Sequence, residues 1–164
     1  METGLFYYIA SIILALIPVV IWLSLIFNKT KHKGLQLLMF FAGTLTVLPI
    51  LALQYIFNIF PQIDLGAILQ NQIHNQNFLL ILVFIGVGIS EELVKQLIIR
   101  SIDRRYLLIQ TIQESIQFSL VSALGFSLIE NILYIYNIWT NVGIQQLFFA
   151  YLFRSIFTTC AHMI

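Results

Sequence analysis

Six ionisable side chains lie within long apolar segments of this 164-residue chain, and they are the residues best suited to do chemistry. An ionisable group at the centre of a membrane-spanning helix costs about 2.5–3.5 kcal/mol on insertion scales, so each one is a candidate for function. Carboxylates and imidazoles act as general acids and bases in hydrolysis. The six residues are Glu91, Glu92, Lys95, Glu130, Arg154 and His162.

The spacing of these residues suggests how they meet. Lys95 follows Glu91 by four residues and Glu92 by three, so on a helix it can neutralise either carboxylate. One glutamate can then stay ion-paired while the other acts as a base. Further along the chain, Arg154, Thr158 and His162 are spaced four apart, which predicts one polar stripe on a helix.

The rest of the chain is apolar enough to hold these groups inside a membrane. Hydrophobic residues make up 60% of it and charged residues 9%, which excludes a soluble domain, and a net charge of +1 excludes a nucleic-acid surface. A hydrocarbon core of about 30 Å needs roughly 20 apolar residues of helix. The sequence therefore predicts an all-α polytopic transmembrane bundle, a single domain over 1–164, with about five spans: 5–27, 35–60, 78–99, 115–138 and 146–164.

Two further features follow from these spans. Pro18 and Pro49 fall inside the first two, where we expect kinks. At 1.5 Å per residue, Glu92 and His162 both lie about 20–23 Å from the outer ends of their spans, so we expect them to share a pocket in the inner half of the bilayer.

The charged connections set the expected topology. Loop 28–34 carries three lysines and loop 100–106 carries three arginines. The positive-inside rule places both in the cytoplasm and the N-terminus outside, in a multi-pass protein of the cell membrane. The segment 160–164 closes the last span without a polar flank, so we expect the chain to be cut short there.

Three interpretations of the buried charges remain open on these grounds. They form an ion-pair network that fixes helix register, they relay protons or cations in a small transporter, or they catalyse hydrolysis. A transporter usually shows an internal repeat, and this sequence has none that we can detect.

Three motifs bear on this choice: an EExxK motif over 91–95, a GFxxxEN motif over 125–131 that is followed by Ile-Leu-Tyr, and an arginine at 154 with a histidine eight residues later. In this order and spacing they resemble the PrsW family of intramembrane proteases, a distant relation of the CAAX-processing and bacteriocin-processing membrane proteases. The resemblance implies cleavage of a membrane-protein substrate in the lipid bilayer, with the first cut of an anti-sigma factor as the best-known case. A non-catalytic relative is the alternative.

The resemblance also assigns residues. Glu91, Glu92 and His162 match positions on which the family's activity is thought to depend, Glu130 and Asn131 match its second motif, and Arg154 matches the arginine before the histidine. We expect the Glu91/Glu92 pair to supply the base and its support, His162 to donate a proton or polarise the scissile carbonyl, and Asn131 to bind the oxyanion. Lys95, Arg154 and Tyr134 would support them.

A metal is left open by the sequence. Glu91, Glu92, Glu130 and His162 offer carboxylate and imidazole ligands of the kind that hold catalytic zinc, but there is no HExxH motif. Two departures from the family pattern stand out: Glu114-Ser115 replaces the usual Asp-Gly, and the family's further helices and second histidine do not follow.

Overall fold

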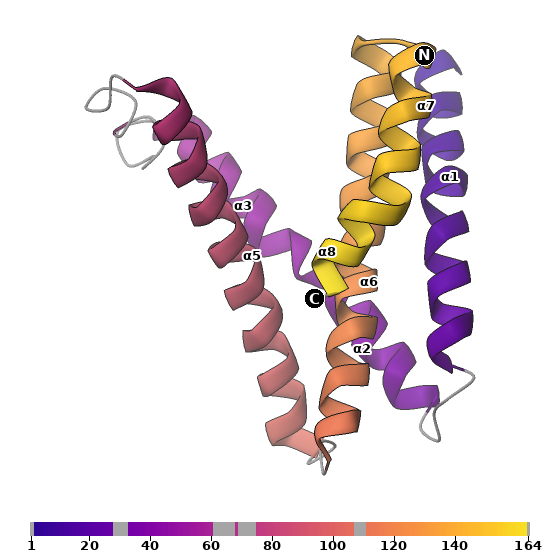
Figure 1. Cartoon of the computed structure of the whole chain (residues 1–164), viewed down its shortest axis with the longest axis vertical. Helices are drawn as coiled ribbons and strands as arrows, with labels where there is room; N and C mark the ends of the chain where they lie inside the picture. The colour runs from indigo at the N-terminus through magenta and orange to yellow at the C-terminus, as the bar shows by residue number, and fades with distance from the viewer. Residues whose placement is uncertain (1, 28–32, 61–67, 69–74, 107–110, 164) are drawn as a thin grey trace.

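The computed structural model describes residues 2–27, 33–60, 68, 75–106 and 111–163, and over these residues the chain is helical apart from short turns. The all-α class predicted from the sequence is confirmed. The helices, shown in Figure 1, are α1 (Glu2–Phe27), α2 (Lys33–Leu45), α3 (Val47–Ile59), α5 (Gln76–Tyr106), α6 (Ile112–Asn141), α7 (Ile144–Phe153) and α8 (Thr159–Met163), with a π-helical turn η2 (Arg154–Thr158) between the last two.

Helix α6 is the centre of the packed part of the molecule. Its first turn is fixed by a capping box, in which Thr111 accepts a hydrogen bond from the Glu114 amide and the Glu114 carboxylate accepts one from the Thr111 amide. Glu114, whose match to the family pattern was imperfect, therefore has a clear structural role. The apolar core then joins α6 to α1, α2 and α7 through Ala15, Val19, Met39, Phe40, Phe118, Val121, Leu124, Leu128, Ile132, Ile135 and Leu147.

Two glycines let α2 and α6 touch through their backbones. A Cβ atom on Gly43 would lie 1.9 Å from the carbonyl oxygen of Ser122, and one on Gly125 would lie 2.1 Å from that of Phe40. No side chain fits at either position. Small residues at such crossings allow the close packing on which membrane helices depend.

The kink predicted at Pro49 takes the form of a break between two helices. Proline has no amide hydrogen, and its ring clashes with the carbonyl four residues earlier, here that of Leu45, where α2 ends. The amide and the hydroxyl of Thr46 both donate to the Gly43 carbonyl, at 3.1 Å and 2.6 Å, which closes the end of α2 with a tight turn. Pro18, by contrast, lies inside α1, which continues through it.

The helices form two arms that meet at one end (Figure 1). One arm holds α3 and α5, and the other holds α1, α6 and α7, while α2 crosses α6 and leads into α3. The end of α5 and the start of α6 lie at the closed end, while the N-terminus and the α6–α7 turn lie at the opposite end. These positions agree with the alternate crossings that the sequence predicted.

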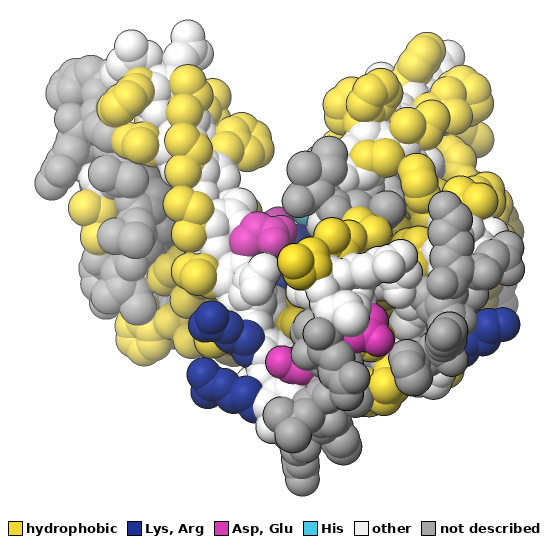
Figure 2. Space-filling model, turned by 60° about the horizontal axis from the view of Figure 1, so that its bottom comes forward, with side chains coloured by type: hydrophobic (Ala, Val, Ile, Leu, Met, Phe, Trp, Pro, Cys, Tyr) yellow, Lys and Arg dark blue, Asp and Glu magenta, His cyan; other side chains and the backbone are white. Residues whose placement is uncertain are grey.

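Four helical segments are long and apolar enough to cross a membrane within the described residues: Gly4–Ile26, Lys33–Ile59, Asn77–Arg104 and Ile112–Asn141. They correspond to the first four predicted spans. The fifth predicted span is also helical, but its π-turn divides it into pieces that are each shorter than a span. Many large apolar side chains of the described residues are exposed, as a lipid environment requires, and Figure 2 shows some of them on one face.

The predicted loop 100–106 is wrong, because α5 runs to Tyr106. No glycine or proline interrupts this stretch, so the helix continues for about two turns after its apolar part ends. Of the predicted loop 28–34, residues 33–34 already belong to α2, and residues 28–32 lie outside the described part of the chain.

Candidate active site

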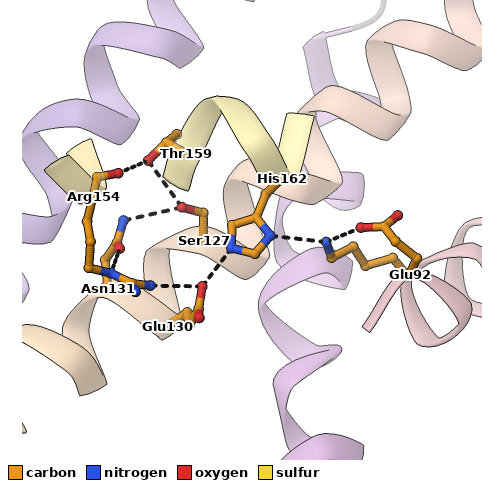
Figure 3. A network of polar contacts seen from close by, with 8 residues as sticks. Glu92, Ser127, Glu130, Asn131, Arg154, Thr159 and His162 are labelled. Atoms are coloured by element: carbon orange, nitrogen blue, oxygen red, sulfur yellow. Dashed lines mark hydrogen bonds and ion pairs between the residues drawn. The ribbon is translucent and has the colours of Figure 1, made fainter. Parts of the chain in front are cut away.

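The polar groups singled out in the sequence come together where α5, α6 and the η2–α8 segment meet. Figure 3 shows them as one continuous network of hydrogen bonds and ion pairs. The motifs over 91–95 and 125–131 and the final arginine and histidine, separate in sequence, thus form a single site. Its members are Glu92, Lys95, Ser127, Glu130, Asn131, Arg154, Thr159 and His162.

Glu130 is the acidic centre of this network. Its Oε2 lies 2.7 Å from Nε2 of His162 and 3.0 Å from Nη2 of Arg154. The contact with Arg154 is an ion pair and not a well-aligned hydrogen bond, whereas His162 is placed to donate its ring N–H. The side chains of Arg154 and His162 are each only 13% exposed, so the carboxylate neutralises charge in a largely dry setting.

Lys95 links α5 to this centre. It is 3% exposed, its Nζ donates to Oε1 of Glu92 at 2.6 Å, and it lies 3.5 Å from Nδ1 of His162. The ammonium group also lies 4.4 Å from the centre of the Phe126 ring, in a cation–π contact. Because an ammonium group only donates, Nδ1 of His162 accepts, and a neutral His162 then carries its hydrogen on Nε2, facing Glu130.

The lysine also decides how the two adjacent glutamates differ. Glu92 is bound by Lys95, although its side chain is 60% exposed. Glu91 is half-buried and makes no hydrogen bond or ion pair with any residue that the structure describes. It does lie within electrostatic reach of Glu130, His162 and Lys95. A carboxylate that faces the site without a partner is the one available to accept a proton.

Asn131 and Tyr134 hold Arg154 from two sides. Oδ1 of Asn131, which is 2% exposed, accepts a hydrogen bond from Nε of Arg154 at 2.8 Å. The guanidinium group lies 4.1 Å from the centre of the Tyr134 ring. Both contacts fix the orientation of the arginine.

The predicted polar stripe is wrong in one member. Thr158 is half-buried, and it is Thr159, fully buried, that joins the network through Ser127 and the Arg154 carbonyl. The stripe assumed a regular α-helix, whereas Arg154–Thr158 forms a π-turn that changes which residues face α6. Sequence reasoning missed Thr159 for this reason. It took Ser127 only as a variable position inside the second motif.

The sequence predicted that Glu92 and His162 share a pocket, and in the structure a third residue, Lys95, lies between them. The two side chains do not touch, but Lys95 contacts both (Figure 3). The space-filling view shows a hollow between the two arms with acidic side chains near its floor (Figure 2). The site is therefore reached from the space between the arms.

A polar, carboxylate-rich site between helices of a membrane protein is consistent with all three interpretations: a structural ion-pair network, transport or hydrolysis. Comparison with known families decides between these. The family model described as "PrsW family intramembrane metalloprotease" matches residues 31–164, so the chain belongs to this family and is a membrane-embedded peptidase. No curated protein and no solved structure matches the chain.

The family description implies a metal ion, so we ask whether the residues of the site could hold one. Among the residues that the structure describes, no three His, Cys, Asp or Glu side chains are grouped as metal ligands. Glu130 and His162 offer one oxygen and one nitrogen, but these already bond each other, and the cations Arg154 and Lys95 flank them. A catalytic zinc takes three protein ligands. The described arrangement does not fit such a centre, and no step below is routed through a metal.

Proposed function

We propose that this peptidase cleaves a membrane-protein substrate with a water molecule that Glu91 activates. The observation that carries this assignment is the contrast between the three glutamates. Lys95 binds Glu92, and Glu130 is bound by Arg154 and His162, while Glu91 has no such partner in the described structure. A general base must have a lone pair available to take the proton of the attacking water.

The carboxylate of Glu91 is sufficient for both proton transfers of peptide hydrolysis. Glu91 takes a proton from water as the water oxygen attacks the scissile carbonyl carbon. The protonated Glu91 then gives that proton to the amide nitrogen as the carbon–nitrogen bond breaks. The proton that remains on the added water oxygen is lost from the new carboxylic acid. Atoms and charge balance without another reactant.

The remaining residues are proposed to stabilise charge and hold position. His162 is partly exposed and within electrostatic reach of Glu91, and its Nε2–H would turn from Glu130 to the scissile carbonyl when a substrate binds. Glu130 and Lys95 orient its ring from opposite sides. Asn131, which the sequence suggested as an oxyanion donor, is buried between Ser127 and Arg154, and we assign it to positioning. Glu92 balances the charge of Lys95.

The proposal also covers the orientation of the protein in the membrane and the class of its substrate. With the N-terminus outside the cell membrane, the two arms spread apart toward the extracytoplasmic side and meet toward the cytoplasmic one (Figure 1). A substrate segment from that side could reach a site in the inner half of the bilayer. The first cut of an anti-sigma factor, the substrate class suggested by resemblance, exposes its scissile bond on the extracytoplasmic side, and this route would bring that bond to the site.

The test is a cleavage assay in cells with a panel of tagged single-span membrane proteins of the host, anti-sigma factors included. The parent chain should produce a shortened product that Glu91→Gln removes while the protein still accumulates in the membrane. Glu114→Gln, a change in the helix cap of α6, is the matched control and should cleave as the parent does. Equal cleavage by the parent and Glu91→Gln would contradict the proposal.

Zinc, the metal suggested by resemblance, would need Glu91 or Glu92 to move toward Glu130 and His162 to complete a set of three ligands. Elemental analysis of the purified, folded chain decides this point. Zinc that is retained by the parent and lost in His162→Ala would assign it. A metal-free parent that still cleaves would rule it out.

A further inference from the structure

The helix that carries Arg154 and His162 contains a π-turn, and this turn solves a problem of geometry. Eight residues of regular α-helix advance about 800°, which would leave these two side chains about 80° apart around the axis. A single i→i+5 turn takes up one extra residue and reduces this angle by about 100°, to about 20° in the other direction. Both side chains can then reach the same carboxylate oxygen, Oε2 of Glu130.

The Arg154 carbonyl oxygen in the π-turn accepts two hydrogen bonds from Thr159. The Thr159 amide donates to the Arg154 carbonyl oxygen, the bond that defines the turn, and its Oγ1 donates to the same oxygen at 3.0 Å. Thr159 is fully buried, so water cannot take the place of the hydroxyl. Loss of the Thr159 hydroxyl would remove one donor to the Arg154 carbonyl and the acceptor of the buried Ser127 hydroxyl, and an unsatisfied polar group in such a place costs about 1–3 kcal/mol.

The Thr159 hydroxyl also belongs to a closed ring of hydrogen bonds. Asn131 Nδ2 donates to Ser127 Oγ at 3.2 Å, and Ser127 Oγ lies 3.3 Å from Thr159 Oγ1. Because Thr159 uses its hydrogen on the Arg154 carbonyl, Ser127 must donate to Thr159. The guanidinium group of Arg154 closes the ring by donating to Oδ1 of Asn131.

Every member of this ring donates in the same direction, so each bond strengthens the next. Ser127 and Thr159 are both 0% exposed and Asn131 is 2% exposed. The ring joins the backbone of Arg154 to its own side chain through α6. It therefore fixes both where the π-turn occurs and where the guanidinium group points.

We propose that Thr159, supported by Ser127, is a positioning residue of the active site, whose hydroxyl holds the π-turn that places Arg154 and His162 on the same face toward Glu130. The inference rests on the proposed function for its effect on cleavage. Its effect on helix geometry stands independently. Without the hydroxyl, the segment relaxes toward a regular α-helix and His162 rotates away from Glu130.

Crosslinking in membranes tests the geometry without any substrate. The rings of Phe126 and His162 lie 5.1 Å apart, so the pair Phe126→Cys and His162→Cys, in a Cys160→Ser background, should react with a short bifunctional thiol reagent. Adding Thr159→Val should reduce this crosslink at least fivefold, whereas Thr159→Ser and the neighbouring control Thr158→Val should leave it unchanged. Undiminished crosslinking with Thr159→Val overturns the proposal.

Cleavage of the panel of single-span membrane proteins is the second readout, and it is measured without the two introduced cysteines. Thr159→Val should lower it about tenfold to a hundredfold, since small displacements of catalytic groups have effects of this size, and Thr159→Ser should restore it. Deleting Ile156 from the π-turn in the Thr159→Val background should also restore cleavage, because seven residues of regular α-helix keep Arg154 and His162 about 20° apart. A general loss of packing would not be repaired by a deletion.

The two proposals fail in different ways. If the parent cleaves nothing but the crosslink responds to Thr159→Val as expected, the positioning role stands and the proposed function falls. If the parent cleaves and Thr159→Val leaves both crosslink and cleavage unchanged, the positioning role falls and the proposed function stands.

Discussion

Helices α5 and α6 carry the two halves of the site, yet they sit in very different surroundings. In the most apolar stretch of α6, 67% of the residues are buried inside the molecule, while in that of α5 none are. On α6, Gly125 meets the backbone of α2, whereas around Gly86 and Gly88 of α5 a Cβ would meet nothing within 4 Å. The α6 half of the site is held by close packing, whereas α5, in the described part of the chain, is packed only near its end, through Ile99 and Ile102, and its polar link to the α6 half is Lys95.

This contrast suggests that the two halves of the site have different roles. The α6 half, with Glu130, Asn131 and the residues of the η2–α8 segment, is over-determined by hydrogen bonds and ion pairs, as a pre-organised catalytic site requires. The α5 half brings in Glu91 and is anchored through Lys95. A helix with few buried contacts can move at low cost. Substrate entry between the arms would therefore displace α5 and leave α6 in place.

The largest expected difference in stability comes from adding one methyl group where α2 meets α6 and one methyl group on α5. Gly43→Ala places a Cβ against the Ser122 carbonyl, so α2 and α6 must separate, at a cost of about 3 kcal/mol or more. Gly86→Ala on α5 meets open space and should change stability by less than about 0.5 kcal/mol. Thermal unfolding in detergent measures both. Equal destabilisation would show that α5 is packed as tightly as α6.

Removing one negative charge from each half should also give unequal results. Glu130→Gln leaves Arg154 and His162 without their shared carboxylate, and because Glu130 is 34% exposed we expect a loss of about 2–3 kcal/mol. Glu92 is 60% exposed, and glutamine keeps an oxygen that can accept from the buried Lys95, so Glu92→Gln should cost less, about 1 kcal/mol. Unfolding of the two variants under the same conditions gives the comparison. If Glu92→Gln proved the more damaging, the α5 half would be the rigid one.

A smaller effect is expected from cutting the link between the halves. Lys95→Met keeps the length of the buried side chain but removes the hydrogen-bond donor to Glu92 and the contact with His162. Cleavage should fall about tenfold, equivalent to about 1.4 kcal/mol in the barrier, while accumulation in the membrane stays close to that of the parent. Lys95→Arg, which keeps the charge, should lose less. Cleavage unaffected by Lys95→Met would mean that α5 is placed by something else.

The fold and most of the site could be predicted from the sequence, because both follow from the free energy of placing apolar or charged residues in a membrane. The length of the apolar segments predicted the helices, and the cost of burying charge identified six residues as a set: Glu91, Glu92, Lys95, Glu130, Arg154 and His162. The π-turn could not be predicted, since residues 154–158 contain no proline or glycine to signal it, and it arises from tertiary hydrogen bonds. Thr159 and Ser127 were missed with it, because a hydroxyl is too common in membrane helices to stand out.

The difference between Glu91 and Glu92 was also beyond the sequence. Lys95 is close enough in sequence to pair with either of them. Only the structure shows that it turns toward Glu92, because its ammonium group must also reach His162 and Phe126. The choice of base therefore depends on a contact between α5 and the last helix, 67 residues further along the chain.

The central claim is that Glu91 is the base, and a single-turnover comparison of two neighbouring isosteric variants tests it most directly. The purified protein, reconstituted in lipid vesicles, would be given a single-span substrate found in the cellular panel. Glu91→Gln should slow cleavage about 100-fold to 10,000-fold, the range that loss of a general base produces, while Glu92→Gln should slow it less than about tenfold. An equal loss in both variants, or a larger one in Glu92→Gln, would contradict the assignment.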